Sequence, residues 1–196
     1  AGEYLFIQFG HNDSKQSDST RYAAPFGDYQ TNLRMFIDHA LSVGAKPVLF
    51  TPVSRRWFDS NGNLKRECHG DYPAAVKQIA NEYNLPLIDA NEITQQWLMS
   101  LGDEATRKYY MWIEEGVNPK HPKGLKDNTH TNIAGARKIV NLLLPEIVRV
   151  IPELASHVVD YDFVVAKDGS GDFFSIQESK MQPGQAEFET PDHHQY

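Results

Sequence analysis

The stretch LFIQFGHNDS, residues 5–14, decides how the rest of the chain is interpreted. A short continuous apolar run stops at Gly10 and gives way at once to polar residues, which is the pattern of a buried strand that ends in a loop. Two further apolar runs follow at 46–51 and 85–90. Because helical patterns separate these strands, the sequence predicts an α/β fold of three layers, a parallel sheet covered by helices on both faces.

Amphipathic periodicity predicts the helices between and after the strands. Apolar residues recur at helical spacing in three segments, 29–41, 73–83 and 93–101. A last helix is expected to start near Thr131 or Asn132, either of which is a good N-cap, and we expect Pro145 to kink or restart it. Two stretches rich in turn-forming residues are predicted to be loops, 53–70 and 113–130.

The composition of the chain changes near residue 155. Residues 1–155 carry the whole alternating pattern and are predicted to form one domain, long enough to bury a core. Residues 156–196 are too few to bury a core of their own. We expect them to form a linker and a short extension, with a polar, aperiodic tail that is disordered.

Composition and charge exclude several classes of protein. With 19 Lys and Arg against 26 Asp and Glu, the net charge of −7 argues against general nucleic-acid binding, which depends on neutralising phosphates. No apolar run approaches the roughly 20 residues that span a bilayer, so we expect no membrane partner. Cys68 is the only cysteine, which excludes an intrachain disulfide and a cysteine-based metal site. The histidines lack the spacing of a zinc peptidase helix, and we expect no catalytic metal.

Two short motifs carry residue types that catalyse acyl transfer. Asp127 lies three residues before His130, near enough for its carboxylate to orient the imidazole and stabilise the imidazolium when the histidine acts as a general base. Asn12 follows a predicted strand and stands near Gly10, where a side-chain amide can donate to a developing oxyanion. Each motif has a structural alternative, because Asp127 can simply start a turn and Asn12 can be a turn or cap residue.

The two motifs together resemble those of the SGNH (GDSL-like) hydrolases. Residues 10–13, Gly-His-Asn-Asp, match the G-x-N-D block of that superfamily, and residues 127–130, Asp-Asn-Thr-His, match its D-x-x-H block. Four segments are similar to those of rhamnogalacturonan acetylesterases and cover about residues 3–150: FIQFGHND, TPVSRRWF, HGDYPAAVKQIANEYNLPLIDAN and DNTHTNIAGARKI. This resemblance implies a flavodoxin-like three-layer fold and hydrolysis of acetyl esters on pectic polysaccharide. It also implies the absence of a metal or organic cofactor, and a secreted or periplasmic location.

The resemblance also assigns roles to residues. Asn12 corresponds to the oxyanion-hole amide, with Gly10 in its loop, His130 to the base that activates a serine, and Asp127 to the orienting acid. The nucleophile of the family lies in a Gly-Asp-Ser block on the first strand. Here each of the four Gly-Asp pairs is followed by Tyr, Glu or Phe, never by Ser. We therefore expect that the first strand-helix-strand portion is missing, with the serine, and that the chain alone shows little or no turnover.

A basic loop is expected to border the same end of the sheet. Arg55 and Arg56 are suited to bind the galacturonate carboxylates of pectin, and Arg56 with Trp57 to form a platform for a sugar ring. His69 is a further candidate contact to substrate. The alternative is a solvated loop in an acidic protein.

Three other functional interpretations come from the same sequence. Residues 163–178 resemble the opening of pectin methylesterases, which implies that a second pectin-modifying domain is fused to the first. A different SGNH activity, such as a xylan acetylesterase or a lipase-like enzyme, is the alternative within the enzymes. A non-catalytic carbohydrate-binding remnant is the alternative outside them.

Overall fold

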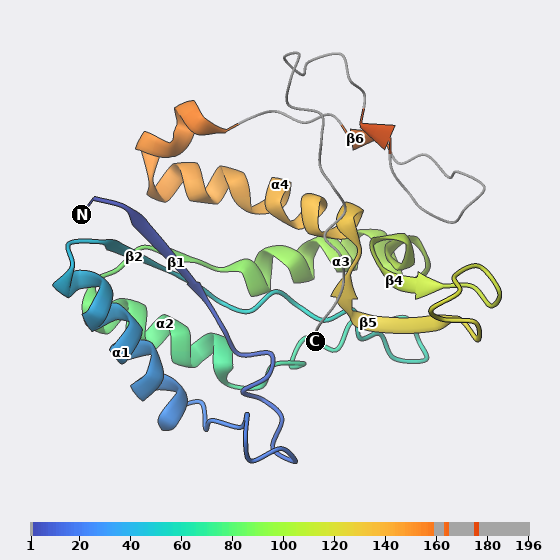
Figure 1. Cartoon of the computed structure of the whole chain (residues 1–196), viewed down its shortest axis with the longest axis horizontal. Helices are drawn as coiled ribbons and strands as arrows, with labels where there is room; N and C mark the ends of the chain where they lie inside the picture. The colour runs from blue at the N-terminus through green and yellow to red at the C-terminus, as the bar shows by residue number, and fades with distance from the viewer. Residues whose placement is uncertain (1, 159–162, 165–174, 177–196) are drawn as a thin grey trace. The chain divides into compact units, whose positions relative to one another are not determined.

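The computed structural model describes residues 2–158, 163–164 and 175–176 (Figure 1). The chain divides into two units, residues 1–158 and 159–196. None of the helices within the described residues is both long and apolar enough to cross a membrane.

A three-stranded parallel sheet lies at the centre of the first unit. Its strands are β1 (Tyr4–Gln8), β2 (Lys46–Phe50) and β3 (Leu87–Ile88), in the order β1-β2-β3. The parallel sheet predicted from the apolar runs is confirmed, although β3 is shorter than the run at 85–90. All three strands run in one direction, so the loops that follow them lie together at the carboxyl ends of the strands.

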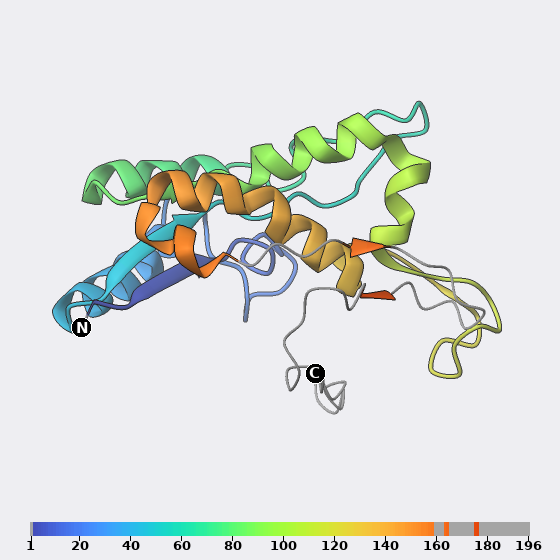
Figure 2. The ribbon, with the colours of Figure 1, turned by 90° about the horizontal axis from the view of Figure 1, so that it is seen from above.

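Helices cover both faces of this sheet, so the predicted three-layer α/β fold is confirmed (Figures 1 and 2). The helices α1 (Asp28–Ser42) and α2 (Tyr72–Tyr83) pack on one face, and α3 (Ala90–Thr106) and α4 (Ile133–Val150) on the other. The central strand β2 serves both layers because its side chains alternate: Leu49 joins the cluster of α1 and α2, whereas Val48 and Phe50 join that of α3 and α4.

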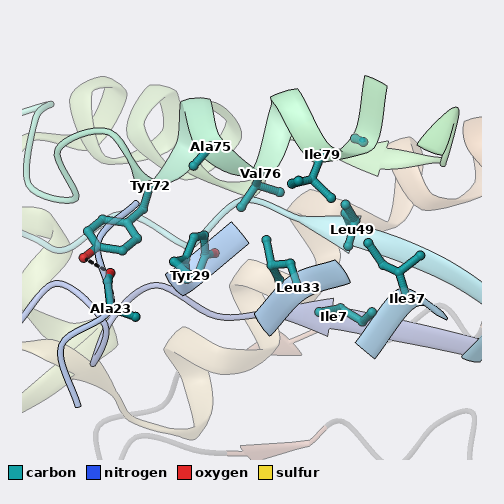
Figure 3. Packing of buried hydrophobic residues seen from close by; sticks show 11 residues of the cluster. Ile7, Ala23, Tyr29, Leu33, Ile37, Leu49, Tyr72, Ala75, Val76 and Ile79 are labelled. Carbon is teal, nitrogen blue, oxygen red and sulfur yellow. Dashed lines mark hydrogen bonds between the residues drawn. The ribbon is translucent and has the colours of Figure 1, made fainter. Parts of the chain in front are cut away.

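The layer of α1 and α2 also holds the loop that follows β1. In Figure 3, Leu33 and Ile37 of α1 face Val76 and Ile79 of α2, and all four side chains are at most 2% exposed. The hydroxyl of Tyr72, in the first turn of α2, lies 2.7 Å from the carbonyl oxygen of Asp13 and 2.8 Å from that of Ala23. This buried hydroxyl ties both ends of the segment between β1 and α1 to the core.

In the opposite layer, α3 is kinked at Gly102, whereas α4 continues through Pro145. Gly102 has φ +79, a conformation that favours glycine, and breaks α3 before the short 3₁₀ helix η1 (Arg107–Tyr109). Asn132 caps α4 as predicted, with its side-chain oxygen accepting from the Gly135 N–H at 3.0 Å. Pro145 lies inside one continuous helix, so the expected restart of α4 does not occur. A second 3₁₀ helix, η2 (Pro152–His157), follows α4.

The predicted loop at 113–130 is confirmed for residues 114–124, but two strands flank it. β4 (Tyr110–Ile113) and β5 (Leu125–Thr131) pair in antiparallel fashion, on the side toward which β1 and β2 run (Figures 1 and 2). The prediction was wrong for residues 125–130 because β5 is mostly polar and does not alternate, so its strand character comes from its partner and not from its own pattern.

One edge of the sheet exposes apolar side chains. Among the described strands, β1 pairs only with β2, and Leu5, Phe6 and Phe9 are 39–45% exposed. The expectation that this run is buried was therefore wrong, except for Ile7, which is 4% exposed. A cavity of about 620 Å³ lies beside the end of β1, lined by Phe9, Asp13, Tyr29, Asn32, Leu33, Met35, Phe36 and His39.

The second unit is described only at β6 (Phe163–Val164) and β7 (Ser175–Ile176), which pair in antiparallel fashion. The polar tail that was expected to be disordered, and most of the segment that resembles a methylesterase, lie outside the described residues.

Candidate active site

Asp127 and His130 form a hydrogen-bonded pair within a bulge of β5. Nδ1 of His130 lies 2.7 Å from Oδ2 of Asp127. Lys126 pairs with Trp112 and Thr131 pairs with Tyr110, so the four residues 127–130 lie opposite a single residue of β4. The bulge releases this segment from the regular ladder and lets a carboxylate and an imidazole three residues apart meet.

The second oxygen of Asp127 holds the bulge itself. Oδ1 accepts from the backbone N–H of Thr129 at 2.7 Å and from that of His130 at 3.0 Å. Burial alone would raise the pKa of Asp127, but the hydrogen bonds from the His130 backbone, the His130 ring and the Thr129 backbone outweigh it and lower the pKa. The carboxylate is therefore ionised at neutral pH, as the orienting partner of a histidine base must be.

The loop after β1 presents Asn12 to solvent. Gly10 has φ +118, and a Cβ there would lie 3.3 Å from Pro52, so the tight turn requires glycine. The backbone N–H of Gly10 donates to the Asp13 carboxylate at 2.9 Å, which closes the turn. The side-chain amide of Asn12 is exposed and makes no hydrogen bond to any described residue. Its role as an oxyanion donor stays a prediction.

The loop of Asn12 lies within electrostatic range of the Asp127–His130 pair, called the dyad below. Burial lowers the pKa of His11 to about 4, with further contributions from the charges of Arg55 and then His130. An effect of His130 on His11 means that the two motifs, separated by more than 100 residues of sequence, lie within electrostatic range of each other. The fold therefore brings both halves of the candidate site close together, near the carboxyl ends of the strands.

Arg55 is buried and hydrogen-bonds to backbone carbonyl groups, so it is not a free basic side chain. It is 9% exposed, and its Nη2 donates to the carbonyl oxygen of His11 at 2.9 Å. Its Nη1 lies 3.4 Å from the carbonyl oxygen of Cys68, and its guanidinium stacks on Trp57 at 4.9 Å from the ring centroid. The stack expected of Arg56 on Trp57 is thus made by Arg55 instead.

Arg56 points to the opposite side, into the interior. It is 2% exposed, and its Nη1 and Nη2 donate to Oδ1 of Asp103 at 2.8 and 2.5 Å. Its backbone N–H donates to the carbonyl oxygen of Asn128 at 2.8 Å and so holds the bulge. This burial leaves the guanidinium of Arg56 no access to a galacturonate carboxylate.

His69 is likewise interior. It is 2% exposed, with Nε2 at 3.2 Å from Nδ1 of His11 and Nδ1 at 3.3 Å from the Cys68 sulfur. Burial lowers its pKa to about 3, helped by the charges of His11 and Arg55. The expected direct contact between His69 and substrate therefore does not fit its burial, although its hydrogen bond to His11 supports the loop of Asn12.

The neutral His11–His69 pair should make the fold acid-sensitive. In the unfolded chain both imidazoles take up protons below about pH 6.5, whereas in the folded protein they do so near pH 4 and 3. The unfolded state thus binds more protons as the pH falls from 6.5 toward 4, and the free energy of unfolding decreases across that window. At pH 5 the loss is about 2 kcal/mol per histidine.

Urea unfolding at pH 7 and pH 5 tests this expectation. The pair lowers the free energy of unfolding at pH 5 relative to pH 7, and His69→Gln should remove about half of this decrease. His39→Gln, at an exposed position on α1, should leave the decrease unchanged. Equal pH dependence in the wild type and His69→Gln would contradict the role of the pair.

Two residues that support the site were not singled out from the sequence, Asp103 and Trp112. The indole N–H of Trp112 donates to the Asn128 side-chain oxygen at 2.9 Å and so supports the bulge from β4. The aromatic run YYMWI at 109–113 is typical of a strand and could have indicated this. No local signal pairs Asp103 with Arg56, because the partners are 47 residues apart.

Within the described residues, no metal-binding cluster is present, and the ring of His130 has one side-chain hydrogen-bond partner. No group of three or more His, Cys, Asp or Glu side chains in that part of the chain could bind a metal ion. Apart from Asp127, no described side chain hydrogen-bonds to the His130 ring. Ser14, the serine nearest to Asn12 in sequence, donates instead to the His11 carbonyl oxygen at 3.0 Å.

Two curated proteins are similar to this chain in sequence. The rhamnogalacturonan acetylesterase RhgT of Bacillus subtilis is 37% identical over 158 residues, which cover 81% of this chain and 66% of the relative. The probable rhamnogalacturonan acetylesterase YesY of the same organism is 36% identical over 141 residues, 72% of this chain and 60% of the relative. The chain thus spans about two thirds or less of the length of these relatives.

Solved structures show the same fold. The protein YxiM of Bacillus subtilis has a TM-score of 0.60 and 25% identity, over 78% of this chain and 38% of that one. An acetylxylan esterase from Geobacillus stearothermophilus has a TM-score of 0.52 and 21% identity, over 74% and 59% of the two chains. The model of the family described as GDSL-like Lipase/Acylhydrolase matches residues 2–143. Because that match covers most of the chain and includes both motifs, the protein belongs to the GDSL-like lipase/acylhydrolase family.

Proposed function

We propose that the protein is a carbohydrate esterase that removes acetyl groups from pectic rhamnogalacturonan. The observation that carries the proposal is the His130–Asp127 pair, 2.7 Å apart, with the histidine side chain 77% exposed. An oriented, accessible imidazole is what a general base in acyl transfer requires. The substrate is inferred from the relatives RhgT and YesY, whose names give rhamnogalacturonan acetylesterase activity.

The proposed reaction proceeds through an acetyl-enzyme. His130 takes the proton of a serine hydroxyl, whose oxygen attacks the acetyl carbonyl carbon, and the Asn12 amide donates to the resulting oxyanion. The imidazolium, stabilised by Asp127, then returns its proton to the sugar oxygen as the ester bond breaks. Water, deprotonated by His130, attacks the acetyl-enzyme, and acetate and the free serine are released.

The serine of this mechanism is proposed to come from a segment outside the printed sequence, which contains no Gly-Asp-Ser. A strand could pair in parallel with β1 on the side away from β2. Its carboxyl end would then lie near Asn12, which follows the carboxyl end of β1. The exposed Leu5, Phe6 and Phe9 would be covered by such a segment.

The location and partner of the protein follow as further proposals. A pectin-modifying esterase works where pectin is found, so we expect it to be secreted or periplasmic. A pectin methylesterase domain after residue 158 would act on the same polymer, in line with the resemblance of residues 163–178.

Complementation tests the proposed function. The chain is co-expressed with the third of RhgT that the alignment does not cover, and the complex is purified by gel filtration. We expect the chain alone to release no acetate from acetylated rhamnogalacturonan and the complemented protein to release it catalytically. Serine-to-alanine substitution in the added segment is the control and should abolish release.

Two outcomes would contradict the proposal. Enzymatic acetate release by the chain alone would show that one of its own residues is the nucleophile. A folded, stoichiometric complex that binds the polysaccharide but releases no acetate would favour a carbohydrate-binding protein.

A further inference from the structure

Trp57 is an exposed aromatic side chain between the two halves of the candidate site. It is 40% exposed. The residue before it, Arg56, donates its backbone N–H to Asn128 in the bulge of the dyad at 2.8 Å. The residue before that, Arg55, donates to the carbonyl oxygen of His11 in the loop of Asn12 at 2.9 Å. The backbone of Trp57 therefore follows a segment that contacts both catalytic motifs.

The neighbours of Trp57 fix the direction of its side chain. Arg56 is buried and Phe58 packs against the core of α3 and α4. Trp57 instead lies with Arg55, whose guanidinium stacks on the indole, and Trp57 remains 40% exposed. A backbone hydrogen bond from the Lys65 N–H to the Trp57 carbonyl oxygen, at 2.7 Å, holds this conformation.

Arg55 holds the indole in place. Its guanidinium lies 4.9 Å from the centre of the ring, and the guanidinium itself is fixed by the carbonyl oxygens of His11 and Cys68. A guanidinium stacked on an indole attracts it through the ring quadrupole. The ring therefore loses little conformational entropy when a ligand covers the surface that remains exposed.

The chemistry of this surface suits a sugar. One face of a pyranose ring presents C–H groups, which stack on a flat aromatic surface, while its hydroxyl groups stay available to water and to polar side chains. We propose, on the basis of the proposed function, that Trp57, braced by Arg55, is the stacking platform for a pyranose ring of the polysaccharide next to the acetylated position. Trp57 is a binding residue in this proposal and takes no part in the chemical steps.

Binding measurements on the full chain test the platform. The probe is an acetylated rhamnogalacturonan oligosaccharide, titrated by calorimetry and by tryptophan fluorescence. We expect Trp57→Ala to raise Kd at least about tenfold and Trp57→Phe, which keeps a flat face, to raise it about threefold or less. Ligand should change the fluorescence of the wild type, and this change should largely disappear in Trp57→Phe.

A matched control separates binding from folding. Leu41→Ala removes a side chain of similar exposure, 47%, at the end of α1 and should leave Kd unchanged. Urea unfolding of each variant shows whether a loss of affinity reflects a loss of structure. Wild-type affinity in a folded Trp57→Ala variant would overturn the platform alone, whereas no binding by the wild type would contradict the proposed substrate as well.

Discussion

Asp127→Asn is expected to lower kcat for acetate release by about 10,000-fold in the complemented protein, with KM little changed. The native carboxylate uses one oxygen for the two backbone N–H groups of the bulge and the other for the ring of His130. Asparagine has a single oxygen. If this oxygen keeps the backbone bonds, the amide NH₂ faces Nδ1, and the imidazole must carry its hydrogen on Nε2. A histidine in that tautomer cannot accept the proton of a serine.

Steady-state kinetics on acetylated rhamnogalacturonan measure this effect. Asp38→Asn, the same substitution at an exposed position on α1, serves as the control and should retain wild-type kcat. More than about a tenth of wild-type kcat in Asp127→Asn would show that the pair does not orient the base. A rise in KM alone would assign Asp127 to binding instead.

Asp103→Ala is expected to lower the free energy of unfolding by about 3 kcal/mol. The substitution leaves the Arg56 guanidinium, 2% exposed, without the carboxylate that both of its terminal nitrogens contact. Its Nε already lacks a hydrogen-bond partner within the described residues. Stacking on Trp112 at 4.9 Å remains, but an aromatic face does not replace a carboxylate. The midpoint of thermal unfolding should fall by about 6–12 °C.

Glu104→Ala is the matched control for this prediction. Glu104 is the next residue, its side chain is 87% exposed, and its pair with Arg107 lies at the surface. Its loss should cost about 1 kcal/mol or less. The double variant Arg56→Met, Asp103→Leu should recover most of the stability, because it removes the buried charge together with its partner. Equal effects of Asp103→Ala and Glu104→Ala would show that the buried charge is not stabilised by this pair.

The helices and the parallel sheet were predictable because their apolar patterns are local. The faces of α1, α2 and α4 repeat at helical spacing, and residues 47–50 of β2 are apolar without a break, as a strand with helices on both faces should be. The strand β5 was not predictable in this way. Its residues are polar, and pairing with β4 together with the Asp127 side chain holds the segment.

The same distinction applies to the site. Asp127 and His130 were identified because their contact spans three residues of sequence. Arg55 and Arg56 were assigned a common role, but only the packed structure shows that both are buried and that they bind different partners, the His11 carbonyl oxygen and the Asp103 carboxylate. The contact between His69 and His11 joins residues 58 apart and had no counterpart in any local pattern.

The bulge of β5 has a consequence for protein engineering. Four consecutive residues contain the proposed general base, its proposed orienting acid and the hydrogen bonds that shape the backbone between them. Two donors from outside those four residues hold the bulge, and both bind Asn128: the indole N–H of Trp112 and the backbone N–H of Arg56. A designed antiparallel hairpin that reproduces the bulge and supplies these two donors should therefore accept the motif as a unit. The pair would then be a transplantable general base, independent of the scaffold that provides the nucleophile.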